Sequence, residues 1–136
     1  MRKSLIAVSL AVSVLCMGGC IFVHSDETQD HGRFSADGTI AEIDAVGKLS
    51  FDSERRKGYE RIAERQGLSP GAQVHLVEAV LGKLSFDNAK EQVLLTLIKN
   101  PGFCSAAERE ILERIDRMAF ESSKKNILKA ISDRKT

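Results

Sequence analysis

The sequence is poor in several residue types on which particular functions depend. It has no tryptophan and only 5% aromatic residues, so we expect no surface that stacks nucleic-acid bases or sugars. Its formal net charge of +1 favours neither a nucleic acid nor an acidic surface as partner. Proline occurs only at Pro70 and Pro101, which leaves room for long helices elsewhere in the 136 residues.

The first twenty residues have the layout of an export signal. Two basic residues are followed by an apolar run from Leu5 to Leu15 and by small residues that end in a cysteine. The last four, Met17-Gly18-Gly19-Cys20, resemble the lipobox of bacterial lipoproteins, in which the cysteine is acylated and the chain is cleaved in front of it. We therefore predict a signal peptide over residues 1–19 and a lipid on Cys20 that holds the protein to a membrane.

The same stretch permits a second interpretation. Leu5 to Val23 is 19 residues long, enough to span a bilayer, so an uncleaved anchor in the inner membrane is the alternative. Under the lipoprotein interpretation, Ile21 occupies the position at which the familiar inner-membrane retention signal has aspartate. By resemblance to that sorting rule, we expect the outer membrane, facing the periplasm, in a Gram-negative cell.

Cysteine and histidine offer little chemistry after the signal. Cys104 is the one cysteine beyond Cys20, which rules out an internal disulfide and a C-x-x-C metal or redox pair in the mature chain. We interpret Cys104 as a small buried apolar residue. Residues 20–38 are polar and read as a tether; His24 and His31 lie there without a recognised ligand spacing. We expect no metal and no cofactor.

One short motif occurs three times in residues 39–136. It reads LSFDS at Leu49–Ser53, LSFDN at Leu84–Asn88 and MAFES at Met118–Ser122, and its phenylalanines are 35 and 34 residues apart. A fixed period of this length is typical of helical repeats. Apolar residues at helical spacing predict about six helices in three helix hairpins of 34–35 residues. The expected fold is all-α, either a compact bundle or, as the alternative, a short right-handed α-solenoid.

Local signals predict several helix ends. Gly67 is a C-cap signal, and Ser69 before Pro70 is an N-cap followed by proline at the first helical position. Ser105 and Glu108 have the spacing of a capping box. The helix after Phe86 is the most apolar of the set, so we expect it to be the central one.

The motif predicts the same helix start in each repeat. We expect its aromatic residue to staple the first turn of the second helix to the core. These residues are Phe51, Phe86 and Phe120. We expect its acidic residue to cap that helix, which suits Asp52 and Asp87; Glu121 is a poor cap, so Ser122 is expected to replace it.

A basic residue follows three positions after each acidic one. The three are Arg55, Lys90 and Lys124. A cation in the first turn opposes the helix dipole, so its recurrence indicates a tertiary use. We expect its stem to cover the core and its head to reach the motif carboxylate. The alternative is a row of cations that binds an anionic partner.

The units F-[DE]-[SN]-x-[RK], each followed by a helix, a short loop and another helix, resemble an uncharacterised bacterial helical-repeat family. Exported members of that family carry repeated Phe-Asp-Ser-x-Lys units. The resemblance covers Gly38 to about Ser132, and Asn88 and Glu121 depart from the commonest form of the motif. It implies a helical-repeat fold and carries no activity to any residue of this chain.

The sequence shows no catalytic grouping, and we expect no enzyme. His75, the lone histidine of the helical region, is flanked by Val74 and Leu76 and reads as a packed or rim residue. The leading interpretation is a membrane-tethered envelope lipoprotein that serves as a protein-interaction or structural module, with an envelope protein as its possible partner. One alternative is a carrier of a small apolar ligand, which an apolar cavity would favour. The other is an envelope hydrolase, which needs His75 beside a carboxylate and a nucleophile.

Overall fold

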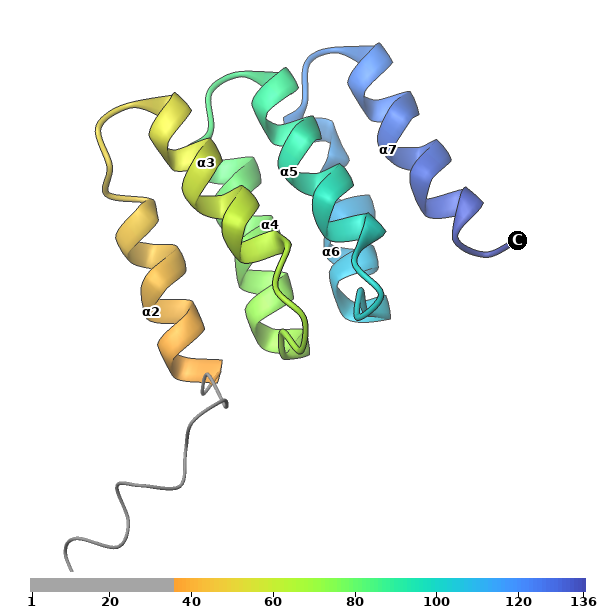
Figure 1. Cartoon of the computed structure of the whole chain (residues 1–136). Coiled ribbons are helices and arrows are strands. Elements are labelled where there is room, and N and C mark those ends of the chain that lie inside the picture. Colours follow the sequence, from red (N-terminus) through yellow and green to blue (C-terminus); the bar gives the residue numbers. More distant parts are fainter. Residues whose placement is uncertain (1–35) are drawn as a thin grey trace, which may run out of the picture. The chain divides into compact units, whose positions relative to one another are not determined.

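The computed structural model describes residues 36–136, in which all regular elements are helices (Figure 1). They are α2 Ala36–Val46, α3 Asp52–Ala63, α4 Pro70–Lys83, α5 Asp87–Lys99, α6 Ser105–Arg114, the short 3-10 helix η2 Ile115–Arg117 and α7 Glu121–Asp133. The prediction of an all-α fold with six helices is confirmed. The predicted signal peptide, the lipobox with Cys20 and most of the predicted tether lie outside the described residues.

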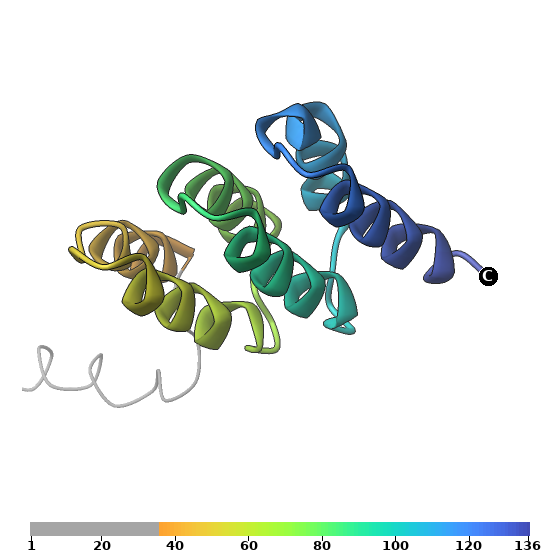
Figure 2. The same cartoon turned by 90° about the horizontal axis from the view of Figure 1, so that it is seen from above.

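The helices form three hairpins that stack side by side. The largest contacts join every second helix: α2, α4 and α6 pack in one layer, and α3, α5 and α7 in the other (Figures 1 and 2). Each hairpin therefore packs on the next one along the chain, which is the arrangement of a short helical-repeat stack. The three loops that carry the motif all lie at one edge of this stack.

The core lies between the two layers. It includes one or more fully buried apolar side chains from every helix of the stack, among them Ile43, Tyr59, Leu76, Leu94, Ile111 and Ile127. Helix α5, predicted to be the central one, packs against α3, α4 and α7, but α4 packs against four helices, α2, α3, α5 and α6, so the central position is shared by both. Residues Phe34–Thr136 make one compact unit whose core is built from its own side chains, so this part of the chain has what it needs to fold by itself.

Glycine permits the closest approach between α2 and α3. A Cβ atom built on Gly58 would lie 2.6 Å from Val46 Cγ1, far closer than two carbon atoms tolerate. The sequence places glycine at this point of α3, so the two helices of the first hairpin pack without a clash.

The N-terminal cap of α4 has the predicted structure. Ser69 Oγ accepts a hydrogen bond from the Ala72 N–H at 3.2 Å, and Pro70 is the first helical residue. The loop before it contains Gly67 with φ +76°, a conformation that glycine adopts without strain. The preceding helix α3 ends at Ala63, earlier than the sequence predicted, so Gly67 belongs to the connecting loop.

The predicted capping box at the start of α6 is absent. Ser105 is the first residue inside the helix, and the residue in front of it, Cys104, makes no side-chain cap bond. Cys104 is half-buried and packs against the core, close to its predicted role as a small apolar residue.

Candidate functional site

Three phenylalanine rings project from the edge of the stack that carries the motif loops. Phe51 is 72% exposed, and Phe86 and Phe120 are each 64% exposed. The prediction that these rings staple a helix to the core is wrong. The buried anchors of the second and third loops are Leu84 and Met118, two residues before the ring, at 4% and 1% exposure. The core is filled there, and the ring is left outside.

We call this surface the phenylalanine edge. It consists of residues 48–51, 83–86 and 117–120, one segment from each hairpin, in which Lys83 is the last residue of α4 and Arg117 the last residue of η2 (Figure 1). Exposed apolar residues that occur singly need no explanation, but a regular row of aromatic rings marks an interaction surface. The threefold repetition makes this edge the candidate functional site.

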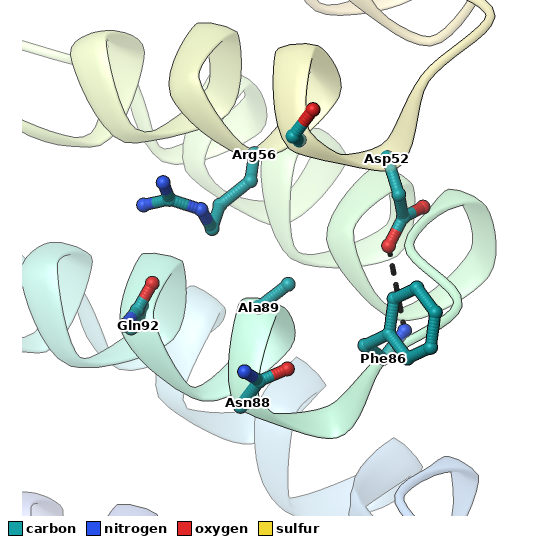
Figure 3. Close-up of a pocket in the computed structure, with 7 residues that line it drawn as sticks. Asp52, Arg56, Phe86, Asn88, Ala89 and Gln92 are labelled. Atoms are coloured by element: carbon teal, nitrogen blue, oxygen red, sulfur yellow. Dashed lines mark hydrogen bonds between the residues drawn. The ribbon is translucent and has the colours of Figure 1, made fainter.

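The acidic residue of the motif does not cap its own helix. The residue at the N-cap position is the phenylalanine itself, without a side-chain cap bond. The carboxylate of Asp52 instead accepts hydrogen bonds from the N–H groups of Ser85 at 3.1 Å and Phe86 at 3.4 Å, in the next repeat (Figure 3). Asp87 does the same for the N–H groups of Ala119 and Phe120. The predicted caps are thus connections between repeats.

The basic residue of the motif completes each connection. Lys90 Nζ donates to the carbonyl oxygen of Arg117 at 3.1 Å and to Asp87 at 3.2 Å. Arg55 donates to the carbonyl oxygen of Lys83 at 3.0 Å, in the matching position, and to its own repeat's acid. We call these acid–base pairs, Asp52 with Arg55 and Asp87 with Lys90, the two clasps. Each clasp holds the next motif loop by both its N–H and its carbonyl groups.

The third pair has no loop to hold among the described residues. Lys124 Nζ contacts Glu121 at 2.7 Å, so the predicted pairing of cation and acid is present in all three repeats. The Glu121 side chain is 72% exposed, whereas Asp87 and Lys90 are only 5% and 7% exposed. The second clasp is therefore the buried one, and Ser122 does not replace Glu121 as a cap.

The buried clasp shifts the titration of its acid. Burial alone would raise the pKa of Asp87, but the N–H groups of Phe120 and Ala119 and the ammonium of Lys90 hold that pKa below its ordinary value. Asp87 is therefore an anion at neutral pH, and as an anion it accepts hydrogen bonds most strongly.

A second set of cations lies on the phenylalanine edge itself. Three positions before each exposed ring the residue is basic: Lys48, Lys83 and Arg117. All three are exposed, and in the described part of the chain their side chains have no hydrogen bond or ion pair. Sequence reasoning missed this set, although aligning the repeats on the phenylalanine would have revealed it. The edge thus combines apolar rings with free positive charge.

A hollow of about 220 Å³ opens beside the first two motif loops. It is lined by Ile43, Asp44, Gly47, Lys48, Tyr59, Ala79 and Lys83. Tyr59 is fully buried, and its hydroxyl oxygen has no hydrogen-bond partner among residues 36–136. Burial raises the pKa of Tyr59 to about 12, so the hydroxyl keeps its proton and is an unused donor.

A wider groove of about 330 Å³ runs between α3 and α5. Its wall includes the Phe86 ring, and Arg56 faces Gln92 across it (Figure 3). Charged side chains line both this groove and the hollow beside Lys48. A carrier of a small apolar ligand needs an apolar cavity between helices instead.

His75 lies in a row of ion pairs across the other layer. Its Nε2 is 2.8 Å from Asp44, its Nδ1 is 3.8 Å from Glu78, and Glu78 also pairs with Arg114. The hydrogen-bond and ion-pair partners of His75 among the described residues are the carboxylates of Asp44 and Glu78. Residues 36–136 contain no cluster of three potential metal ligands and no helix long and apolar enough to cross a bilayer.

Compared with protein-family models, curated proteins and solved structures, the chain shows no significant match. The resemblance to a family with Phe-Asp-Ser-x-Lys units therefore stays a prediction.

Proposed function

We propose that this protein is a lipid-anchored helical module of the cell envelope that acts by binding, not by catalysis, and that its binding surface is the phenylalanine edge. The observation that carries the proposal is the 64–72% exposure of Phe51, Phe86 and Phe120 at equivalent positions of three repeats. Burying a phenylalanine side chain contributes about 1.5–3 kcal/mol, so three rings offer several kcal/mol to a partner.

The clasps support a binding role because they fix the loops that carry Phe86 and Phe120 before a partner arrives. Asp52 and Asp87 each hold two backbone N–H groups of the following loop, and one of those groups belongs to the phenylalanine itself. A preorganised loop loses little conformational freedom on binding, which raises affinity.

The place of action follows from the N-terminal sequence. The lipobox Met17-Gly18-Gly19-Cys20 supports a lipid anchor, and Ile21 supports the outer membrane in a Gram-negative cell. Fractionation tests the anchor: the wild type is expected with the membranes and Cys20→Ala in the soluble fraction. If both forms distribute alike, the anchor is refuted.

Crosslinking in cells tests the binding surface. A photoreactive phenylalanine analogue at position 86 is expected to give adducts with an envelope component. The matched control is the same analogue at Leu128, which is 43% exposed but lies away from the edge. Adducts at Leu128 with none at positions 51, 86 and 120 would refute the edge as the binding surface.

A further inference from the structure

We infer that the phenylalanine edge docks on a bilayer surface that carries anionic phospholipid headgroups. This inference rests on the proposed function, since it names the partner of the same surface. In this arrangement Phe51, Phe86 and Phe120 enter the apolar boundary of the bilayer, while Lys48, Lys83 and Arg117 pair with headgroup phosphates.

The shape of the edge favours lipid over a folded protein. Its apolar groups are exposed rings on the loops that connect the two helices within each hairpin. These loops lie in a row along one side of the stack (Figure 1). A protein partner must supply a matching pocket for each ring, spaced to suit the repeat. A fluid bilayer accepts projecting aromatic side chains at its interface without such pockets.

The clasps lower the cost of placing these loops against lipid. An unsatisfied backbone N–H costs several kcal/mol in an apolar medium. In the second and third loops these donors are already bonded: those of Ser85 and Phe86 to Asp52, and those of Ala119 and Phe120 to Asp87. Two of the three rings, those of Phe86 and Phe120, therefore approach the bilayer on loops whose N–H groups at these positions are already hydrogen-bonded within the protein.

The positive charges of the edge favour a bilayer whose surface is anionic. Lys48, Lys83 and Arg117 are exposed and free of carboxylates, although the chain as a whole is nearly neutral. Most other cations of the described part have an acidic partner, for example Arg56 with Glu60 and Arg65 with Glu42. A basic residue near an anionic bilayer contributes about 1 kcal/mol, so the free cations add directly to the effect of the rings.

The hollow beside the first two loops supplies a place for one phosphate group. Two of the edge cations, Lys48 and Lys83, line it, and the buried Tyr59 hydroxyl beside them is a donor without an acceptor among the residues that the structure describes. Asp44, the acid of this hollow, is hydrogen-bonded to His75 on α4. The donors of the hollow thus suit a phosphate oxygen.

The chain between the predicted lipid and the stack is long enough for this orientation. Fifteen residues separate Cys20 from Ala36, and that length spans at most about 50 Å. Helix α2, with 11 residues, carries the chain from Ala36 toward the edge over only about 16 Å. A lipid on Cys20 therefore permits the edge to face the same bilayer.

Fluorescence quenching tests the docking without the anchor. We would use residues 20–136 with Cys20→Ala, so that neither the signal nor an acyl chain contributes. The chain has no tryptophan, so Phe86→Trp is a single probe. With vesicles of phosphatidylcholine containing about a third phosphatidylglycerol and brominated acyl chains, this probe is expected to be quenched. Leu128→Trp, the matched control away from the edge, is expected to stay unquenched.

Three results would overturn the inference. They are no quenching at position 86, equal quenching at position 128, or equal quenching in vesicles of phosphatidylcholine alone. If in-cell crosslinks at position 86 to a protein accompany the first result, the proposed function stands and the lipid partner is wrong. If crosslinks at the edge are also missing, both fail.

Charge substitutions test the headgroup contacts. Replacing Lys48, Lys83 and Arg117 by glutamine is expected to weaken vesicle binding about fivefold per residue. The control, Arg61, Lys99 and Arg109 to glutamine, removes the same charge from exposed positions off the edge and is expected to have a much smaller effect. If the two triple variants lose vesicle affinity equally, only the net charge of the protein matters, and the proposed headgroup contacts are wrong.

Tyr59→Phe separates binding in the hollow from folding. It removes a donor that has no partner in the described part of the protein, so the fold is expected to survive while vesicle affinity falls about tenfold. Unchanged affinity for the anionic vesicles would exclude the hollow as a phosphate site. Competition by free inorganic phosphate at millimolar concentration would show that the hollow takes the ion rather than the headgroup, which also contradicts the proposal.

Discussion

Asp87→Ala removes the acceptor that holds the third motif loop. In the wild type this carboxylate takes hydrogen bonds from the N–H groups of Ala119 and Phe120 and from the ammonium of Lys90. After the substitution, Lys90 is a cation at 7% exposure that keeps only its bond to a carbonyl group. Breaking a buried pair by removing one partner costs about 3–5 kcal/mol.

The repeats provide graded controls for this prediction. Asp52 makes the same bonds, but its side chain is 15% exposed and that of Arg55 is 22% exposed, so Asp52→Ala is expected to cost about 1–2 kcal/mol. Glu121 is largely exposed and holds no further loop among the described residues, so Glu121→Ala is expected to cost the least. The order of destabilisation is Asp87, then Asp52, then Glu121.

Urea denaturation of residues 20–136 with Cys20→Ala, followed by circular dichroism, measures this order. A domain of about 100 residues has only about 5–15 kcal/mol of stability, so the Asp87→Ala midpoint falls sharply. In Asp87→Ala with Lys90→Met the cost is expected to be partly recovered, because no buried charge is left unpaired. Equal effects of the three single substitutions would refute the clasps as connections between repeats.

Three further predictions follow from the same contacts. Because the pKa of Asp87 is lowered in the folded state, its contribution to the free energy of unfolding is complete above the ordinary carboxyl pKa of about 4 and is lost as pH falls through the lowered value. The free energy of unfolding is therefore expected to fall more steeply with decreasing pH in the wild type than in Asp87→Asn. Parallel curves for the two proteins would contradict this. Tyr59→Phe removes a buried hydroxyl that has no partner among the described residues, so the thermal midpoint is expected to stay the same or rise. A loss of more than about 1 kcal/mol in the free energy of unfolding would show that the hydroxyl has a hydrogen-bond partner. Gly58→Ala places a methyl group against Val46 and is expected to cost about 1–3 kcal/mol in a thermal melt, whereas Gly71→Ala, with open space around it, is the neutral control.

The helices and their number follow from the sequence because each hairpin repeats the same apolar spacing and the same motif. Ser69 and Pro70 mark the start of α4 with purely local chemistry, and there the prediction was right. The role of Asp52 was wrong because its partners, Ser85 and Phe86, lie 33 and 34 residues away. The repeat period of the sequence shows which residues are equivalent. It does not show whether their hydrogen bonds stay within one repeat or reach the next repeat.

The position of the phenylalanine rings also lay beyond local reasoning. An apolar residue at a helix start is expected to face the core. Leu84 and Met118 are buried in the second and third loops, whereas Phe86 and Phe120 stay exposed. The candidate site therefore became visible only when exposure was known, although the recurring cation three residues before each ring was a readable signal.

We propose that the phenylalanine edge is the surface by which this protein binds in the envelope. The most direct test of this proposal is the fluorescence of Phe86→Trp in residues 20–136, with Cys20→Ala, on mixing with membrane vesicles prepared from the envelope, which hold both lipid and protein. We predict a blue-shifted emission for Phe86→Trp and an unchanged emission for Leu128→Trp. An unchanged spectrum at position 86, or an equal shift at position 128, would contradict the account.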